Sequence, residues 1–381
     1  MDPRVSLSRT RGAVKRAALA RSVMLRARMD LARRSLDGPP LERGELLRVL
    51  GPELPLLPVL HEARLVRERS FGNRVRVHIL NNAQNARCPE DCGYCSQSAV
   101  TNAPLRPYPW KPKEELVAEA RAAHAAGAFR YCMVASGRGP TDRQIEFLAD
   151  AVRAIRAEVP VRICVSAGLL DEPKARALRE AGVDRLNHNL NTSERRYPAI
   201  CSTHGYADRV ATLRAARAAG LEACSGLIAG MGEDDGDLVD VALALRELEV
   251  PSIPVNFLLP IEGNPIQSDG SLSPERALRV LAMVRLANPR AEVRVAAGRE
   301  GHLRSLEALA LWPANSLFVE GYLTTKGRSA ADTYSMIRDA GFVVEGPEGE
   351  ILPWASLGLD EVFRVLGDER ILKPSVLAQL R

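Results

Sequence analysis

Three cysteines stand close together in the stretch CPEDCGYCSQS, where Cys88, Cys92 and Cys95 fall within eight residues of a 381-residue chain that has seven cysteines in all. A closed structural zinc site needs four protein ligands, and the next cysteine along the chain is Cys132. Three thiolates on one loop instead favour a four-iron cluster whose fourth iron stays open to an outside ligand. The spacing therefore predicts an iron–sulfur centre, with zinc as the alternative.

Three further cysteines, Cys132, Cys164 and Cys224, lie inside apolar runs that read as strands (FRYCMV, VRICVSA and LEACSGLIAG). Each one alone predicts a buried, inert core cysteine, because free cysteine is among the most buried residue types. Together they could line the inside of one barrel and hold a second metal centre. Arg294 stands on another such run, where a buried charge is costly without a partner, and a thiolate-rich cluster would be that partner.

The elements that must position these residues alternate along the chain. Short apolar or β-branched runs predict eight strands, over residues 75–80, 129–134, 161–167, 183–190, 221–230, 252–259, 291–298 and 315–321. Apolar residues spaced by three and four predict helices between most of them, over residues 113–127, 141–157, 172–182, 206–219, 235–248, 273–288 and 301–310.

Strand, helix and strand joined by short connections indicate parallel pairing with right-handed crossovers. The predicted fold is therefore an α/β (β/α)8 barrel of the TIM type, complete or nearly so, with an N-terminal helical extension and a small C-terminal appendage. An open doubly wound sheet is the alternative, but no glycine-rich phosphate loop follows the first strand. In a barrel, the loop that carries the first three cysteines belongs to the catalytic face.

The chain divides into a basic N-terminal extension (1–40), a barrel with a helical cap at 41–50 (41–325) and an appendage (326–381) with a helix over 331–340, a turn at 346–350 and a last short helix. Residues 1–34 carry ten basic and two acidic side chains, a net of +8, so the rest of the chain, with +5 in total, carries −3. The basic arm predicts an N-terminal helix, with an organelle transit peptide or an RNA-binding tail as the alternatives. The charge therefore does not indicate a nucleic-acid partner.

Composition narrows the setting of the protein. The chain is 46% hydrophobic, but no run approaches the roughly 18 apolar residues of a membrane helix. An odd number of cysteines without a secretory leader predicts a reducing compartment rather than a disulfide framework. We expect a cytoplasmic protein with no membrane partner, or a mitochondrial one if the source is eukaryotic.

The cysteine loop resembles that of the radical S-adenosylmethionine (SAM) enzymes, and further segments resemble the biotin synthase family. The carrying segments span most of the predicted barrel and are CPEDCGYCSQS (88–98), YCMVASGRGP (131–140), LNHNLNTSE (186–194), CSGLIAGMGE (224–233), PVNFLLPIEGNP (254–265) and VRVAAGRE (293–300). This resemblance implies an enzyme that inserts sulfur into dethiobiotin by a 5′-deoxyadenosyl radical mechanism. The alternatives are another radical SAM barrel, of the hydrogenase maturase or methylornithine synthase type, or a non-enzymatic iron–sulfur electron carrier.

The same resemblance implies two clusters in addition to SAM. The 4Fe-4S cluster would be ligated by the three loop cysteines, and the 2Fe-2S cluster, the source of the sulfur, by Cys132, Cys164, Cys224 and Arg294. It also implies an electron donor of the flavodoxin or ferredoxin type, the iron–sulfur assembly machinery as a partner, and a homodimer.

Neutral side chains are expected to bind the small molecules. By the resemblance, Tyr94 lies near the adenine of SAM, Asn189 and Asn191 reach its ribose, and Asn189 and Asn256 contact the ureido ring of dethiobiotin. Many family members carry aspartate at the position of Asn191, and an asparagine can still accept a hydroxyl hydrogen.

Period-two spacing places Asn187, Asn189 and Asn191 on one face of a strand and His188 on the other. His188 is therefore predicted to be a structural histidine with its hydrogen bonds satisfied. Cys201 has no role by the resemblance and is expected on a loop at the catalytic mouth. A loop thiol could replace the arginine as fourth ligand of the second cluster, but we expect the arginine, because a strand fixes it at the depth of the barrel interior.

Overall fold

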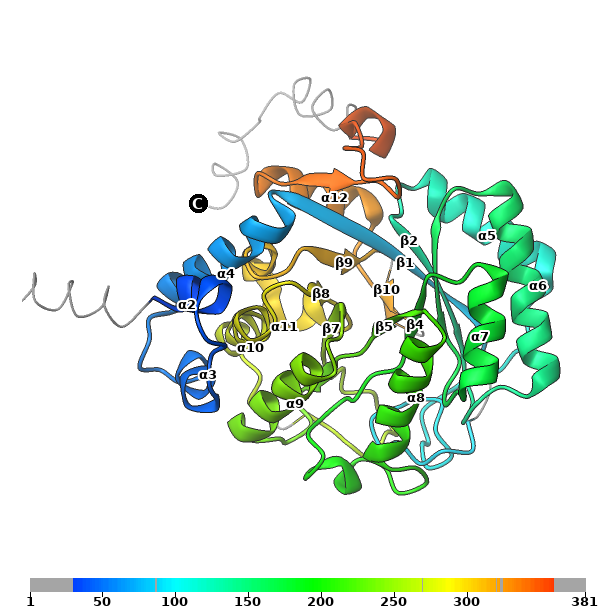
Figure 1. Cartoon of the computed structure of the whole chain (residues 1–381), viewed down its shortest axis with the longest axis horizontal. Helices are drawn as coiled ribbons and strands as arrows, with labels where there is room; N and C mark the ends of the chain where they lie inside the picture. The colour runs from blue at the N-terminus through cyan, green and yellow to red at the C-terminus, as the bar shows by residue number, and fades with distance from the viewer. Residues whose placement is uncertain (1–29, 86–87, 269, 320, 323–324, 360–381) are drawn as a thin grey trace, which may run out of the picture.

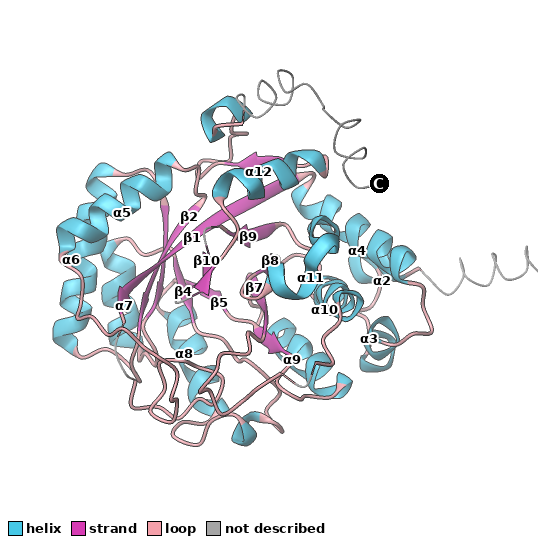
Figure 2. Cartoon of the chain, turned by 180° about the vertical axis from the view of Figure 1, so that it is seen from behind, coloured by secondary structure: helices cyan, strands magenta, loops and turns pink. Residues whose placement is uncertain are grey.

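A computed structural model describes residues 30–85, 88–268, 270–319, 321–322 and 325–359 (Figure 1). The predictions for most of the basic arm and for the end of the appendage lie outside these residues. The described chain forms a closed parallel barrel surrounded by helices (Figure 2). The predicted (β/α)8 class is confirmed.

Eight parallel strand positions form the barrel. The pairing of β9 with β1 closes it, with Ser316 opposite Arg76. The fifth position is shared by two short strands, β5 and β6, which are separated by two residues and both pair with β7. Gly226 lies in this break, where a Cβ atom would stand 1.8 Å from the carbonyl oxygen of Pro254. The strands are β1 (Arg74–Gln84), β2 (Arg130–Ala135), β3 (Arg162–Ser166), β4 (Arg185–Asn187), β5 (Glu222–Cys224), β6 (Leu227–Ala229), β7 (Ser252–Phe257), β8 (Glu292–Val295) and β9 (Ser316–Phe318).

Helices cover the outside of the barrel at nearly the predicted positions. On α6, Leu148, Val152 and Ile155 follow helical spacing and are buried together with Ile163 and Val165 of β3. One difference is that the last predicted helix is a short α-helix followed by a 3-10 helix. The helices are α5 (Lys113–Ala125), α6 (Asp142–Glu158), α7 (Glu172–Ala181), α8 (Tyr206–Ala218), α9 (Asp235–Glu247), α10 (Pro274–Ala287), α11 (Arg299–Leu303) and η2 (Arg304–Leu311).

The N-terminal part of the described chain consists of α2 (Leu31–Asp37), α3 (Arg43–Leu50) and α4 (Leu56–Phe71). Helix α3 matches the predicted cap, whereas the longer α4 was not predicted. Within the predicted extension, Leu31 and Ala32 are buried, and the backbone N–H of Ala32 donates to Glu62 at 2.8 Å. The end of the extension is therefore packed on α4.

The C-terminal part contains the hairpin strands β10 (Gly321–Tyr322) and β11 (Thr325–Lys326), then α12 (Ala330–Asp339), β12 (Val343–Glu345) and the 3-10 helix η3 (Trp354–Leu357). Helix α12 confirms the helix predicted at 331–340. Strand β12 was not predicted, and it pairs in parallel with the first residues of β1. The appendage thus extends the sheet of the barrel and brings the carboxylate of Glu345 to Arg76, with Oε2 2.9 Å from Nε.

Candidate active site

A cavity of about 290 Å³ opens at the carboxyl ends of the strands. The long connection between β1 and α5, which carries the first three cysteines, forms one of its walls. All but one of the predicted site residues line it, namely Cys88, Cys92, Tyr94, Cys95, Cys132, Cys164, Asn189, Asn191, Asn256 and Arg294. The exception, Cys224, lies next to the cavity, with its Sγ 3.7 Å from Nη1 of Arg294.

The cysteine loop is shaped by its own backbone. The N–H of Cys88 donates to Gln97 at 2.7 Å, and the N–H of Cys95 donates to Cys92 at 3.0 Å. Burial raises the pKa of both the Cys88 and the Cys95 thiols. A bound metal cluster supplies the positive charge that makes thiolates stable in such a place, so the donor set fits an iron–sulfur cluster.

Two acidic residues anchor this loop to the segment before α8. The carboxylate of Asp91 accepts hydrogen bonds from the backbone N–H groups of Ser202 at 2.9 Å and Thr203 at 3.1 Å. Burial opposes the charged form of Asp91, but the hydrogen bonds from Ser202 and its neighbours outweigh this cost and hold its pKa well below the usual range. Glu90 is bound in a similar way by Thr203, at 2.8 Å, and by His204. The loop is therefore attached through carboxylates to residues 202–204.

The strand cysteines Cys132 and Cys164 face the inside of the barrel, as predicted. On β2, Tyr131 and Met133 pack outward against the helices, whereas Cys132 faces the interior. Cys164 of β3 is its direct cross-strand neighbour. The hydrogen bond from Cys164 lowers the pKa of Cys132. Two thiols from adjacent strands thus face the same interior space as Arg294.

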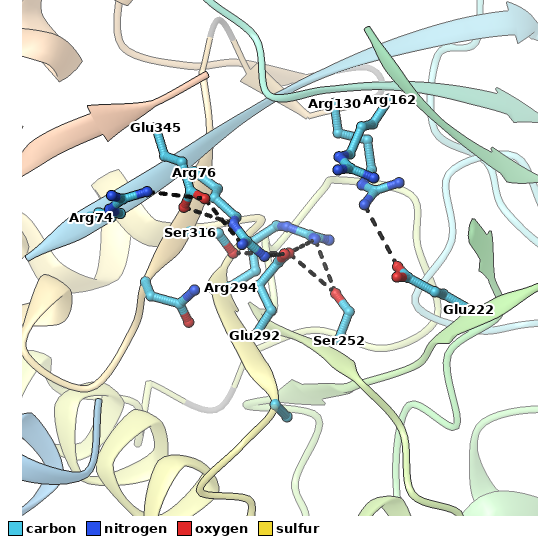
Figure 3. A network of polar contacts seen from close by, with 12 residues as sticks. Arg74, Arg76, Arg130, Arg162, Glu222, Ser252, Glu292, Arg294, Ser316 and Glu345 are labelled. Carbon is cyan, nitrogen blue, oxygen red and sulfur yellow. Dashed lines mark hydrogen bonds and ion pairs between the residues drawn. The ribbon is translucent and has the colours of Figure 1, made fainter. Parts of the chain in front are cut away.

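Arg294 emerges from β8 into a buried network of charges (Figure 3). Its guanidinium forms an ion pair with Glu292 and lies 3.1 Å from Oγ of Ser252 through Nη2. Its Nε has no hydrogen-bond partner among the described residues. A buried guanidinium with a free N–H beside cysteine thiols fits a ligand that is not a protein atom, as the predicted two-iron cluster would be.

Glu292 stands at the centre of this network and was not among the predicted site residues. Burial opposes its charge, but Arg185 at 3.1 Å, Arg294 and His78 at 3.2 Å hold its pKa well below the usual range. Arg76 also reaches it, at 3.3 Å. A signal was available: Glu292 precedes Arg294 by two residues on a strand, a spacing that places both on one face.

Tyr94 and Asn191 contact each other across the cavity wall, with the amide of Asn191 donating to the Tyr94 hydroxyl at 2.6 Å. The backbone of Asn191 is left-handed (φ 70°), a conformation that asparagine tolerates better than most residues. Arg209 of α8 lies behind both, with Nη2 3.5 Å from the Tyr94 hydroxyl and Nη1 2.7 Å from the carbonyl oxygen of Asn189. Arg209 was not predicted, because nothing in its helical sequence marks it as facing a site.

The other asparagines are held in place by the barrel. The amide of Asn256 donates to the carbonyl of Leu227 and accepts from the N–H of Ala297, both at 3.2 Å. An amide has two hydrogens and two lone pairs, so Asn256 keeps one of each for a molecule in the cavity. Asn187 donates to Asn189 at 3.2 Å and lies 3.3 Å from the sulfur of Cys224.

The prediction for His188 is wrong. Its side chain lines the same cavity as the asparagines, and its Nε2 has no hydrogen-bond partner among the described residues. Burial, with Arg209 and His204 nearby, lowers its pKa well below the usual range, so the ring is neutral. The physical reason is that β4 ends at Asn187, so the period-two alternation assumed in the prediction does not continue.

Cys201 lies with the loop cysteines. Its Sγ is 3.6 Å from Sγ of Cys92, 3.3 Å from Nδ1 of His204 and 3.1 Å from Asp91. It belongs to the apolar cluster of Cys92, whereas Cys132 and Cys164 belong to another. The geometry therefore favours Arg294 over Cys201 as the companion of the strand cysteines.

Two family profiles match the chain, the Radical SAM superfamily over residues 85–245 and the Biotin and Thiamin Synthesis associated domain over residues 254–343. Among solved structures, an FeFe-hydrogenase maturase from Carboxydothermus hydrogenoformans has a TM-score of 0.71 at 19% identity, covering 90% of this chain and 84% of its own. A methylornithine synthase has a TM-score of 0.70 at 20% identity, covering 82% and 96%. These two share the fold. Barrel, cysteine loop and profile together define an enzyme of the radical SAM class.

Curated relatives narrow the class. The biotin synthase of Acaryochloris marina is 53% identical over 85% of this chain and 92% of its own length, and that of Magnetococcus marinus is 50% identical over 84% and 100%. The chain belongs to the biotin synthase family. It is a radical SAM enzyme of biotin synthesis, which confirms the predicted family and argues against the alternatives of a maturase, a methylornithine synthase or an electron carrier.

None of the helices in the described part of the chain combines the length and the apolar character of a membrane span.

Proposed function

We propose that the two thiol sets of the cavity hold the two clusters of a biotin synthase. Cys88, Cys92 and Cys95 ligate the 4Fe-4S cluster that binds SAM. The 2Fe-2S cluster is ligated by the deeper set, Cys132, Cys164, Cys224 and Arg294. The observation that carries the proposal is that both sets meet at one cavity, one on a loop and the other on strands.

The bound cofactors supply a carbon radical that removes hydrogen from saturated carbons of dethiobiotin, and the sulfur that replaces it. The protein must then hold dethiobiotin between SAM on the four-iron cluster and the two-iron cluster. The loop cysteines and Tyr94 form the outer wall, the asparagines the middle, and the strand cysteines the inner wall. This order supports binding of the substrate between the source of the radical and the source of the sulfur.

Recognition of dethiobiotin falls to neutral groups. A ureido ring offers two N–H donors and one carbonyl, and an amide side chain matches both kinds of group without burying a charge. Asn256 is fixed by two backbone hydrogen bonds and has one donor and one acceptor left. Asn189 lines the same cavity, beside Asn187 and Asn191. We assign Asn189 and Asn256 to the ureido ring.

Recognition of SAM falls to the loop side. The Tyr94 hydroxyl and the Asn191 amide are already paired at 2.6 Å, which fixes the tyrosine ring as a flat wall for the adenine. Asn189 and Asn191 reach the ribose. The pairing means that each side chain orients the other.

The finer setting follows the family. An electron donor of the flavodoxin or ferredoxin type reduces the four-iron cluster, and the iron–sulfur assembly machinery builds both clusters. The enzyme works as a homodimer in the cytoplasm.

Iron and sulfide counting on protein purified without oxygen tests the assignment. The wild type is expected to hold about six iron atoms per chain, four in one cluster and two in the other. Cys132→Ala should keep the four-iron cluster and reductive cleavage of SAM while losing the two-iron absorption and biotin formation. Cys88→Ala should lose SAM cleavage. Biotin formation by Cys132→Ala at the wild-type rate would show that the strand cysteines do not hold the sulfur source.

A further inference from the structure

The three nitrogens of the Arg294 guanidinium have different contacts with the surrounding residues. Nη2 has three partners: the carboxylate of Glu292, Oγ of Ser252 at 3.1 Å and Nε2 of His78 at 3.4 Å. Nη1 faces the sulfur of Cys224 at 3.7 Å. Of the two terminal nitrogens, Nη1 is thus the one directed at the thiols.

Glu292 sets this orientation, since an arginine side chain has many rotamers. The side chain of Glu292 is only 2% exposed, and its carboxylate is ion-paired with the buried guanidinium of Arg294, which is 3% exposed. Two hydroxyls, of Ser252 and Ser316, each lie 3.3 Å from the same Oε1 atom. The carboxylate cannot turn away from Arg294 without losing these contacts.

The remaining cations of the network have carboxylates of their own. Arg76 is bound by Glu345, at 2.9 Å and 3.2 Å. Arg185 is bound by Glu222 at 2.8 Å. Figure 3 shows Glu292 between the guanidinium groups of Arg76 and Arg294, with Glu345 and Glu222 on the far sides. Arg294 has no ion-pair partner other than Glu292 among the described residues.

We propose that Glu292 is a positioning residue for the two-iron cluster: it holds Nη2 of Arg294 and thereby presents Nη1 to the iron. The inference rests on the proposed ligand set, in which Arg294 is a ligand. Glu292 itself touches neither substrate nor cluster and acts through Arg294. An iron–Nη1 bond would replace one N–H bond of the guanidinium, whose proton would leave to solvent. Glu292 itself exchanges no proton or electron, and its carboxylate fixes a geometry.

A double-mutant cycle tests the proposal on the anaerobic enzyme with both clusters in place. The measured quantity is the half-life of the two-iron absorption at 25 °C, with four-iron content and SAM cleavage as the sign that the barrel is folded. Glu292→Gln, which keeps the size of the side chain but loses the ion pair, is expected to shorten the half-life about tenfold. Glu345→Gln changes a partner of Arg76 and Arg74, and Glu222→Gln changes a partner of Arg185 and Arg130. Both leave the ion pair of Arg294 with Glu292 in place, so each is expected to leave the half-life within about twofold. The effects of two substitutions add in the double mutant when the residues act independently, and they do not add when both act through the same contact.

The Arg294→Ala background separates the possible causes. If Glu292 acts through Arg294, Glu292→Gln has no further effect on the half-life in that background. A second tenfold loss there would overturn the inference, because Glu292 would then act through the fold and not through the ligand. Pulsed electron paramagnetic resonance of the reduced two-iron cluster adds a readout that a structural role would not move: the nitrogen coupling from the arginine is expected in wild type and weakened in Glu292→Gln.

Failure of the proposed function gives a different result. If Arg294→Ala by itself leaves the nitrogen coupling and the half-life unchanged, Arg294 is not a ligand, and the ligand assignment falls together with the inference. If Arg294→Ala abolishes the coupling while Glu292→Gln leaves both coupling and half-life as in wild type, the ligand assignment stands and the positioning role of Glu292 is wrong.

Discussion

The two thiol sets of this enzyme are held in different ways. The outer set, Cys88, Cys92 and Cys95, lies on one loop that is attached through Glu90 and Asp91 to the segment 201–204. The inner set comes from three separate strands, and ion pairs that reach as far as β12 surround it. With the proposed ligands, the loop would be able to yield when SAM binds to the open iron, whereas the strands would fix the cluster whose sulfide must meet a substrate carbon. The difference assigns adaptability to one end of the cavity and rigidity to the other.

The largest effect is expected where the loop is attached. Asp91→Asn removes the charge that receives the hydrogen bonds of Ser202 and Thr203, so the loop should loosen and the four-iron cluster should be lost about tenfold faster in air-free buffer. The two-iron cluster should stay. Absorption and iron content measure both. Equal loss of both clusters would mean that the loop and the strands are not independent.

The attachment also has a pH dependence. Because the pKa of Asp91 is depressed in the folded protein, its contribution to stability is full above the ordinary pKa of aspartate and is lost as the pH falls through the lower folded value. Retention of the four-iron cluster in the wild type should therefore be insensitive to pH near neutrality, and Asp91→Asn should stay below the wild type throughout that range.

The asparagines in the middle of the cavity are tested through the substrate. Asn256→Ala removes a donor and an acceptor expected to bind the ureido ring, so KM for dethiobiotin should rise about tenfold, the effect of roughly 1.4 kcal/mol. KM for SAM should change little, which makes the SAM titration the control. A larger rise in KM for SAM than in KM for dethiobiotin would contradict the assignment of Asn256 to the ureido ring.

A smaller effect is expected on the outer wall. Tyr94→Phe keeps the ring and deletes the hydroxyl that receives the Asn191 hydrogen bond, so KM for SAM should rise about fivefold, corresponding to a neutral hydrogen bond of about 1 kcal/mol. Steady-state cleavage of SAM measures it. An unchanged KM for SAM with a raised KM for dethiobiotin would show that Tyr94 contacts dethiobiotin and not SAM.

The smallest effect is expected outside both regions. Removal of residues 1–29 should leave both clusters and the activity unchanged. Removal of residues 1–34 is less neutral than the sequence suggested, because Leu31 and Ala32 are buried and the Ala32 N–H binds Glu62. Thermal unfolding of the two truncated proteins compares them, and a lower midpoint for the longer deletion alone is the expected result.

The sequence was sufficient for the barrel and for the residues whose types carry chemistry. Alternation of apolar strands and amphipathic helices is a local property, and it predicted the position of every barrel strand to within a few residues. The apolar strand runs that contain Cys132 and Cys164 were enough to expect both thiols inside the barrel. The period-two rule failed for His188, because a strand of three residues does not sustain the period.

What only the tertiary structure decided is which distant side chains meet. Arg209 reaches Tyr94 from a helix 115 residues along the chain, and Arg76 joins Glu292 from 216 residues away. Cys201 could be placed on the mouth by its position but not against Cys92. Local sequence fixes the face on which a residue lies, because backbone periodicity is local. The partner on that face depends on how the barrel closes, and that is set by packing over the whole chain.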